Sequence, residues 1–274
     1  MKHIAAIVVC YHPDRELLRA NIGAFADEVD TILVWRNSPE SLEWLKEDFP
    51  NVIFLGNGEN AFIARPLNEA LRYCADNGHE WLLTMDQDSH WDNFKGFIES
   101  VSNMKNAESV GLFAPNVNWF SQPTDIEFKD IEWVIQSGML LNLNALRDIA
   151  EFREDYQIYG VDEEFCYWLN HNNKKVRILP SFNLSQKYGN PTKSKFGFTV
   201  YNYSPLVRYF TIRNMLWMKR EFPDSTTARR ICSVIAHNTR DIIFAENHKF
   251  KKLSKMTKGI IHGLFKSIRK REHA

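Results

Sequence analysis

The stretch LLTMDQDSHW, residues 82 to 91, places two carboxylates at the end of an apolar run. In an extended chain, residues i and i+2 point to the same side, so Asp86 and Asp88 would repel each other unless a cation lay between them. Mg²⁺ or Mn²⁺, hard ions that prefer oxygen ligands, would suit this pair and could bridge it to a diphosphate. A solvated loop with a helix-capping Asp is the alternative. The apolar run ahead of the pair favours the metal site.

Strand-like and helix-like segments alternate through the N-terminal part of the chain, which is typical of a parallel sheet with helices on both faces. The predicted strands are residues 4–11, 31–37, 51–56 and 80–86, and the predicted helices are residues 13–25, 38–49 and 64–78. Ser38 is the expected N-cap of the second helix. Ligands of such sheets bind at the carboxyl ends of strands. Tyr11, Asn37, Asp86 and Asp88 occupy such ends and are candidate site residues.

The rest of the chain is less regular at first and then wholly helical from about residue 203. We expect strands at residues 109–117, 132–142 and 174–180, and helices at residues 143–150 and 161–172. The sequence therefore predicts an α/β fold with a mostly parallel central sheet flanked by helices, followed by a C-terminal helical extension.

Composition excludes several classes of protein. The 274 residues are 44% hydrophobic, and Lys+Arg and Asp+Glu both total 34, so a global basic field for nucleic acid is absent. The four cysteines are far apart, which predicts buried free thiols in a reducing compartment. The histidines lack zinc-site spacing, and no apolar run is long enough to span a membrane.

Three consecutive acids, Asp162, Glu163 and Glu164, begin the helix predicted at residues 161–172. Acids favour the positive end of the helix dipole, which explains them without any function. The functional alternative makes Asp162 a general base, because a carboxylate at a helix start projects into the cleft that the preceding loop lines. The residues alone leave both interpretations open.

Two further motifs also have alternatives. Ser137 and Gly138, in VIQSGMLLN, would let the backbone approach a ligand closely, although a β-bulge explains them equally well. Arg213 lies on an apolar helix and needs a partner, which could be a phosphate, one of the acids at 162–164, or an ordinary buried ion pair.

Seven short stretches occur in an order that resembles a known family. They are VVCYHP, RNS, GENAFIARPLNEAL, LLTMDQDS, IQSGMLLNLNAL, YGVDEEFCYWL and YFTIRNMLW, within residues 4–218. The chain resembles the family 2 inverting glycosyltransferases of the GT-A fold, in their bacterial rhamnosyltransferase-like branch. Each stretch is weak alone, whereas the ordered set is fairly specific.

The resemblance implies roles for residues at the strand ends and in the loops beside them. Cys10 and Tyr11 would line the nucleotide base pocket, and Asn37 would sit beside the base and the ribose. Asn60 and Asn68 match the loop and the helix over the nucleotide. These five residues are therefore candidate nucleotide-sugar-binding residues.

The same resemblance assigns the acids. Asp86 would reach the ribose or the metal, and Asp88 would ligate Mg²⁺ or Mn²⁺ on the diphosphate. Asp162 matches the catalytic base, with Glu163 as the next candidate, and Glu164 matches the second acid. The residues grouped on the acceptor side or around the site are Ser137, Gly138, Glu163, Glu164 and Arg213.

Three positions depart from the family pattern. Arg36 stands where relatives usually carry an Asp that reads the base or the ribose. Phe62 stands where relatives often carry Gly, in the loop over the nucleotide. Gln186 stands where relatives often place a His as a further metal ligand, and its amide oxygen would be a weaker ligand.

The resemblance thus implies a metal-dependent, inverting glycosyltransferase with a catalytic domain over residues 1–218 and a helical extension over residues 219–274. It would move a sugar, rhamnose or another hexose, from a nucleotide-diphosphate donor to a hydroxyl of a growing bacterial surface polysaccharide, such as lipopolysaccharide or capsule, or of a lipid-linked oligosaccharide. One alternative is a haloacid-dehalogenase-type phosphatase, whose first Asp is a nucleophile. The other is a non-catalytic sugar-binding protein on a transferase fold, for which Arg36 and Gln186 argue.

The tail, residues 248–274, holds nine Lys and Arg and one acid. Its apolar residues recur at spacings of three and four and so share one helical face: Phe250, Leu253, Met256, Ile260, Ile261, Leu264, Phe265 and Ile268. Such a stripe among cations is typical of a helix in a membrane interface. We therefore expect a cytoplasmic enzyme, peripheral on the inner face of the cell membrane, with no nucleic-acid partner. A helix that packs its stripe on the catalytic domain is the alternative.

Overall fold

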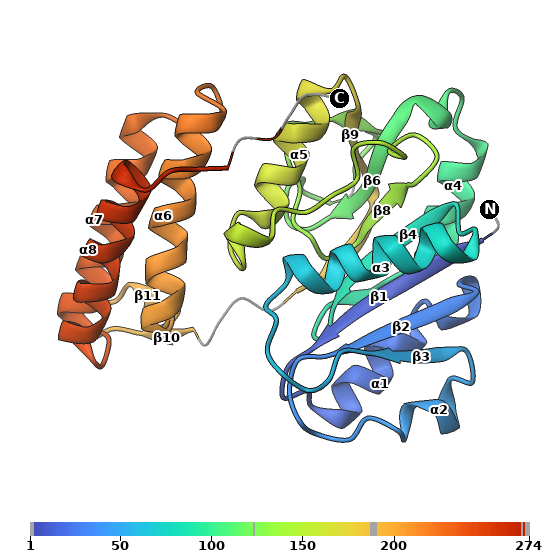
Figure 1. Ribbon diagram of the computed structural model, residues 1–274, viewed down its shortest axis with the longest axis horizontal. Helices are drawn as coiled ribbons and strands as arrows, with labels where there is room; N and C mark the ends of the chain where they lie inside the picture. The colour runs from blue at the N-terminus through green and yellow to red at the C-terminus, as the bar shows by residue number, and fades with distance from the viewer. Residues whose placement is uncertain (1–2, 123, 187–190, 270, 272–274) are drawn as a thin grey trace. The chain divides into compact units, whose positions relative to one another are not determined.

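The computed structural model describes residues 3–122, 124–186, 191–269 and 271. Contacts divide the chain into two compact units, and Figure 1 labels most of their helices and strands. Of the described residues, the first or sheet unit holds those up to 154 and 161–186, and the second or helical unit holds 155–160 and those from 191 onward. The short segment 155–160 therefore belongs to the helical unit, although both of its flanks belong to the sheet unit.

A mixed sheet forms the centre of the sheet unit. Its first half is parallel, in the order β3-β2-β1-β4, with β1 at Ile4–Cys10, β2 at Thr31–Arg36, β3 at Val52–Leu55 and β4 at Trp81–Asp86. The order continues β8-β6-β9-β5, with β8 at Met139–Asn142, β6 at Val110–Asn116, β9 at Lys175–Ser185 and β5 at His90–Trp91. The short strand β7, at Lys129–Asp130, also pairs with β9. Strand β8 is antiparallel to both of its neighbours. The predicted α/β fold is confirmed, with the antiparallel pairs confined to the half beyond β4.

Helices follow the strands, as the alternating pattern predicts. They are α1 at Arg15–Gly23, α2 at Leu45–Asp48, α3 at Ala64–Asn77, α4 at Phe94–Asn103 and α5 at Val161–His171. Helix α1 begins after Asp14, whose side chain accepts a hydrogen bond from Leu17 N–H. Helix α3 ends at Gly78, which adopts φ +70° as left-handed C-caps do.

Three expected elements are shorter or absent. The helix predicted at residues 38–49 is reduced to the four residues of α2, whose N-cap is Trp44. Ser38 Oγ instead accepts a hydrogen bond from His12 N–H at 2.8 Å. Residues 143–149 form turns instead of a helix, and the strand predicted at 132–142 begins only at Met139. Local propensity was overridden at these places by tertiary contacts.

The central strands are buried on both faces. Every residue of β1 is buried, as are the inner residues of β2 and β4. Strands covered on both faces need no polar side, which explains their continuous apolar runs. Cys10, Cys74 and Cys166 are buried free thiols as predicted, whereas Cys232 is exposed, contrary to the prediction.

Three long helices and a short hairpin make up the helical unit. They are α6 at Pro205–Glu221, α7 at Ala228–Phe244 and α8 at Lys249–Phe265, with β10 at Thr192–Lys193 and β11 at Thr199–Val200. The domain boundary predicted at residue 218 lies inside α6, which belongs to the helical unit as a whole. A functional division at that residue stays a prediction. None of the described helices is both long enough and apolar enough to cross a membrane.

Two glycines let α8 pack closely on α6. A Cβ at Gly259 would lie 2.6 Å from the backbone oxygen of Tyr209, and a Cβ at Gly263 would lie 2.7 Å from Leu216. Either contact would force the helices apart. The glycines weaken α8 as an isolated helix, and the close approach that they permit offsets this weakness.

A buried ion cluster joins all three helices. Glu246, in the connection between α7 and α8, forms ion pairs with Arg208 of α6 and Lys252 of α8, the second at 2.8 Å. Arg208 also donates to the side chain of Asn238 in α7. All three charges are buried, so each is stabilised chiefly by the others.

Replacing Glu246 by Ala should therefore destabilise the helical unit by about 3–5 kcal/mol, because two cations would stay buried without their anion. Hydrogen exchange of the α6 and α8 amides, followed by mass spectrometry, measures this loss locally. The matched control is Glu43→Ala, which breaks an exposed pair with Lys46 at 3.7 Å and should change stability by only about 0–1 kcal/mol. Unchanged exchange in Glu246→Ala would contradict a stabilising role for the cluster.

Candidate active site

The carboxyl ends of β1, β2 and β4 meet at one edge of the sheet, which we call the carboxyl edge. Across β1 and β4, Val9 is paired with Asp86, and across β1 and β2, Cys10 is paired with Arg36. Asn37 N–H donates to the backbone oxygen of Cys10 at 2.8 Å. The strand ends predicted to carry site residues therefore lie side by side.

Tyr11 and Gln87 clamp the ends of β1 and β4 together. Tyr11 N–H donates to Gln87 Oε1 at 2.7 Å, and Gln87 Nε2 donates back to the backbone oxygen of Tyr11 at 3.1 Å. The Tyr11 side chain stays 49% exposed, whereas burial raises the pKa of the Cys10 thiol to about 12 and keeps it a neutral packing group. Gln87 was not predicted, because the two Asp residues beside it explained the motif without it.

Three carboxylates act on one another at this edge. The chain turns at residues 87–88, so Asp86 and Asp88 do not belong to one extended strand as predicted. Their charges are nevertheless close, because the carboxylates of Asp88 and Asp162 both help to raise the pKa of Asp86 to about 7, after burial as the main cause. Burial also raises the pKa of Asp162. Two motifs that the sequence treats separately thus form one acidic site.

Residues 136–138 connect the backbone of Asp86 to the carboxylate of Asp162. Gln136 N–H donates to Asp162 Oδ2 at 3.2 Å, and Asp86 N–H donates to Ser137 Oγ at 3.1 Å. The segment therefore fixes where the end of β4 lies relative to the start of α5. Gln136 was not predicted, since its contribution is a backbone N–H that no sequence pattern marks.

Gly138 closes this bridge onto β4. Its N–H donates to the Thr84 oxygen at 2.7 Å, and its φ of +87° lies in the region that favours glycine. A Cβ at this position would lie 2.8 Å from Pro115 Cγ. The glycine thus serves a tight junction between strands, and its predicted contact with a ligand stays untested.

The acids after Asp162 occupy the first turn of α5. Glu163 N–H donates to Asp162 Oδ1 at 3.0 Å, and Glu164 is fully buried. The helix dipole favours all three acids at this place. Among them, Asp162 is the one whose charge raises the pKa of Asp86.

Gln186 places its side-chain amide beside the carboxylate of Asp86. Its Nε2 donates to Asp86 Oδ2 at 2.8 Å, while its buried Oε1 has no hydrogen-bond partner among the described residues. Asp86, Asp88 and this amide oxygen could ligate Mg²⁺ or Mn²⁺, and a bound diphosphate would supply further oxygens. Within the described part of the chain, no three His, Cys, Asp or Glu side chains form a metal cluster by themselves.

Asn37 holds the loop after β3 instead of facing open space. Its Oδ1 accepts hydrogen bonds from Trp35 Nε1 at 2.9 Å and from Ala61 N–H at 2.8 Å, and its Nδ2 donates to the Phe62 oxygen at 2.7 Å. Both ends of the amide thus already bond to the protein. Asn37 therefore positions the loop, and its predicted contact with a nucleotide stays a prediction.

The same loop explains two departures from the family pattern. Arg36 Nη2 donates to the Gly56 oxygen at 2.8 Å, so the guanidinium braces the loop that follows β3. Phe62 adopts φ +60°, which accounts for the Gly that relatives often carry there. Asn60 Oδ1 accepts from Phe62 N–H at 2.9 Å and supports that strained conformation.

Asn68 lies buried in α3 and binds the chain ahead of residue 155. Its Nδ2 donates to the Phe152 oxygen at 2.8 Å and to Glu154 Oε1 at 3.2 Å, and its Oδ1 accepts from Phe152 N–H at 2.7 Å. These bonds position the segment that leads to residues 155–160. Contact between Asn68 and a nucleotide likewise stays a prediction.

Arg213 has partners that the sequence did not predict. In the helical unit, its Nη2 donates to the Asp155 and Tyr156 oxygens at 2.6 and 3.3 Å, and its guanidinium lies 4.1 Å from the centre of the Trp217 ring. Among the described residues, backbone carbonyls and aromatic rings take the place of the expected acid or buried ion pair, and a phosphate partner stays a prediction. Burial lowers the pKa of Arg213.

Asn214 lies beside Arg213 in the same motif, and the sequence assigned it no role of its own. Its Nδ2 donates to the backbone oxygens of Tyr156, Ile158 and Tyr159 at 2.9, 3.0 and 2.6 Å. The pair therefore holds residues 155–160, the loop that ends two positions before Asp162. An Arg-Asn pair on an apolar helix face was the available signal, because two buried polar side chains together imply a shared polar partner.

Comparisons with known proteins show which sequences and folds this chain resembles. No family model matches the chain. A dTDP-rhamnosyl transferase of Shigella flexneri, RfbF, is 23% identical over 96% of this chain and 95% of its own length. The structure of GalNAc-T7 with UDP, GalNAc and Mn²⁺ matches with a TM-score of 0.62 at 9% identity, over 96% of this chain and 56% of that one. S. aureus TarS 1-349 with UDP-GlcNAc matches with a TM-score of 0.56 at 13% identity, over 96% of this chain and 82% of that one.

The chain is similar in sequence to this rhamnosyl transferase and has the GT-A fold of these glycosyltransferase structures. It spans just over half the length of the GalNAc-T7 structure that it matches. The predicted GT-A fold and the resemblance to rhamnosyltransferases are confirmed. The phosphatase alternative is not favoured, because the Asp pair follows β4 of a GT-A sheet and the first strand ends in Cys10.

Asp86→Asn should stabilise the protein in a pH-dependent way. The folded-state pKa of about 7 exceeds the ordinary 3.8, so folding binds a proton between these values and stability falls as pH rises through them. Asn carries no charge at any pH, so the increase in the free energy of unfolding caused by Asp86→Asn should be near zero at pH 4 and greatest above pH 7. A gain of ~1 kcal/mol would raise the melting temperature by about 2–4 °C.

Thermal unfolding at several pH values measures this effect, with exposed Asp125→Asn as the control that should not shift the curve. A gain from Asp86→Asn that is independent of pH would show that repulsion and burial of the charge are not its cause.

Proposed function

We propose that this chain is an inverting glycosyltransferase that moves a sugar from a nucleoside-diphosphate donor to a hydroxyl group. The meeting of Asp86, Asp88 and Asp162 at the carboxyl edge of a GT-A fold carries this proposal. The S. flexneri relative is named for dTDP-rhamnose transfer, which makes dTDP-rhamnose the first donor to test. The UDP and UDP-GlcNAc complexes of structural neighbours support nucleoside-diphosphate sugars as the donor class.

Asp162 is the general base of this proposal. It takes the proton from the acceptor hydroxyl, whose oxygen attacks the anomeric carbon from the face opposite the leaving diphosphate. The N–H groups of Gln136 and Glu163 orient the carboxylate, and burial raises its pKa, which makes it a stronger base than an exposed Asp. A single displacement of this kind inverts the anomeric carbon.

Asp86 and Asp88, with Gln186 Oε1, are the residues that would hold a divalent cation. When bound, Mg²⁺ or Mn²⁺ would neutralise the charge that develops on the leaving diphosphate. The Mn²⁺ in the GalNAc-T7 structure supports divalent metal use on this fold. Burial raises the pKa of Asp86 most, the charges of Asp88 and Asp162 add to it, and a bound cation would favour the ionised carboxylate against these effects.

The acceptor and the location follow from the sequence resemblance. We propose a hydroxyl of a growing surface polysaccharide or of a lipid-linked oligosaccharide, modified at the cytoplasmic face of the cell membrane. A non-catalytic sugar-binding protein is the remaining alternative, and release of nucleoside diphosphate in a turnover assay separates the two.

Asp162→Asn should lower kcat by about 10²–10⁴-fold, because positioned base catalysis contributes that much. Donor binding, measured by calorimetry with dTDP-rhamnose and Mn²⁺, should stay unchanged. Exposed Glu127→Gln is the control and should keep the turnover of the unchanged chain. Near-normal turnover of Asp162→Asn would assign the base to another residue.

Asp88→Ala should reduce donor affinity in Mn²⁺ to the value measured without metal. The physical reason is that the cation loses a carboxylate ligand and no longer bridges protein and diphosphate. Exposed Asp92→Ala, in the same region of the chain, is the control. If Asp88→Ala keeps the full Mn²⁺ effect on donor affinity, the metal ligands lie elsewhere.

A further inference from the structure

The helical unit exposes large apolar side chains around the connection between α7 and α8. Phe196, in the turn between β10 and β11, Phe244, at the end of α7, and Phe250, in the first turn of α8, are 68%, 55% and 90% exposed. The rings of Phe196 and Phe244 lie 5.6 Å apart between centroids. Lys249 Nζ donates to the Ile243 oxygen at 2.6 Å, which ties the start of α8 to the end of α7. We call the three rings and Ile243 the aromatic end.

The aromatic end is held in place by the ion cluster described above. Glu246, halfway along the connection, is buried and paired with Arg208 and Lys252. The connection therefore cannot rotate its aromatic neighbours inward without breaking two buried ion pairs. A fixed, exposed apolar cluster of this kind marks an interaction site.

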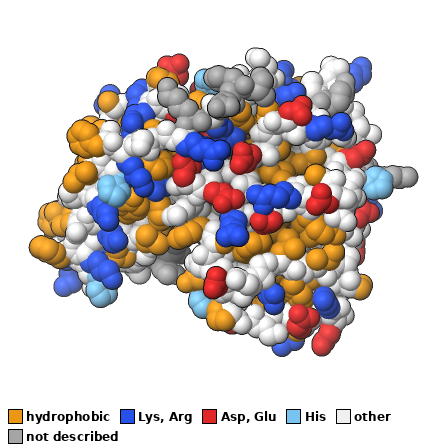
Figure 2. All heavy atoms as spheres, in the orientation of Figure 1, with side chains coloured by type: hydrophobic (Ala, Val, Ile, Leu, Met, Phe, Trp, Pro, Cys, Tyr) orange, Lys and Arg blue, Asp and Glu red, His pale blue; other side chains and the backbone are white. Residues whose placement is uncertain are grey.

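The charge around the aromatic end is entirely positive. Residues 191–274 hold eighteen Lys and Arg and five Asp and Glu, a formal charge of +13 in a chain whose total is zero. Within 191–200 and 241–258, both acids, Asp241 and Glu246, are buried. The exposed cations of these segments are Lys193, Lys195, Lys249, Lys251 and Lys258. Figure 2 shows Lys and Arg side chains beside hydrophobic ones over the region that Figure 1 assigns to α7 and α8.

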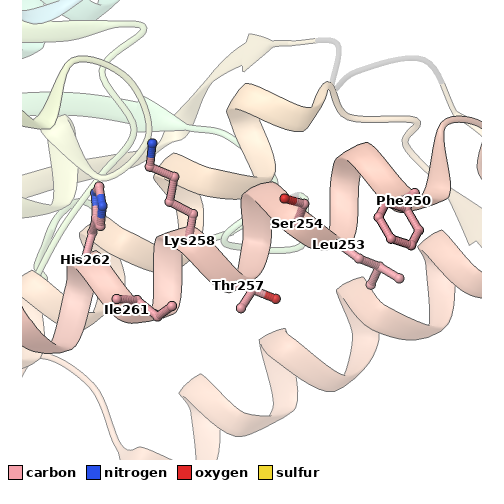
Figure 3. A pocket seen from close by; sticks show the side chains of 7 residues that line it. All are labelled: Phe250, Leu253, Ser254, Thr257, Lys258, Ile261 and His262. Carbon is pink, nitrogen blue, oxygen red and sulfur yellow. The ribbon is translucent and has the colours of Figure 1, made fainter.

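Helix α8 divides the stripe that the sequence predicts. Leu253, Met256 and Ile260 pack in the core of the helical unit. The prediction that the whole apolar stripe faces a membrane is therefore wrong for these three residues. Phe250, Ile261, Leu264 and Phe265 remain exposed. A shallow groove along α8 is lined by Phe250, Leu253, Ser254, Thr257, Lys258, Ile261 and His262, and Figure 3 shows Phe250 and Leu253 at one end of it and Ile261 and His262 at the other.

We propose that the helical unit binds an anionic lipid surface through the aromatic end and the exposed face of α8. Exposed Phe side chains would enter the headgroup region, and the lysines around them would meet lipid phosphates. A second copy of the chain fits this face less well, because it would bring Lys251 and Lys258 against the same cations of its partner. This inference is independent of glycosyl transfer, since it uses none of the carboxyl-edge residues.

Sedimentation of the full chain with lipid vesicles tests the proposal without donor or acceptor. Binding should occur to vesicles of equal parts phosphatidylglycerol and phosphatidylcholine, weaken as salt rises, and be absent with phosphatidylcholine alone. Phe250→Ser should lower the partition coefficient about tenfold, because a Phe side chain loses its apolar surroundings. The change keeps the net charge, so a purely electrostatic attraction predicts no effect.

Ile126→Ser, an exposed apolar residue of the sheet unit, is the matched control and should bind vesicles as the unchanged chain does. Lys249→Glu combined with Lys251→Glu should abolish binding to anionic vesicles. Circular dichroism checks that each variant is folded. We expect the variants to fold, because all the substituted side chains are exposed. The proposal is overturned if the chain ignores anionic vesicles, if Phe250→Ser binds them unchanged, or if Phe250→Ser instead dissociates a dimer in solution.

Discussion

Like charges gathered at one edge of the sheet are the constraint around which the sheet unit is arranged. Asp86 and Asp162 come from different elements and would separate if nothing held them. Residues 136–138 supply that hold, with one hydrogen bond to the backbone of Asp86 and another to the carboxylate of Asp162. Burial and the neighbouring carboxylates both disfavour the charged form of Asp86, so a bound cation or a proton would stabilise this part of the site.

The motifs that carry the family resemblance divide into two physical kinds. Asp86, Asp88 and Asp162 present charged atoms at the carboxyl edge. Asn37 and Asn68 instead spend their amides on backbone groups of loops. A motif can therefore recur because it shapes the backbone around a ligand, without touching the ligand itself.

The sequence predicted the fold well where elements are long and apolar. Strands β1, β2 and β4 and helices α1, α3 and α5 follow from burial on both faces and from capping residues, which are local signals. The short α2 and the turns at 143–149 were predicted wrongly. At Ser38, a hydrogen bond from the distant His12 replaces the expected helix cap, and local sequence does not reveal such a contact. At the site, side-chain types pointed to the acids, whereas the backbone N–H of Gln136 left no sequence pattern. The Arg213-Asn214 pair indicated a shared polar partner but did not indicate which loop it would hold.

Phe62 shows how the loop after β3 constrains future sequence change. The positive φ there is imposed by Asn37 and Asn60, whose side chains bond to the Phe62 oxygen and N–H. Such a backbone costs an L-residue roughly 1–2 kcal/mol, and more for side chains branched at Cβ. Position 62 is thus open to Gly or Asn and closed to Val, Ile or Thr for as long as Asn37 is kept. Mutational drift at one site is in this way governed by a residue twenty-five positions away.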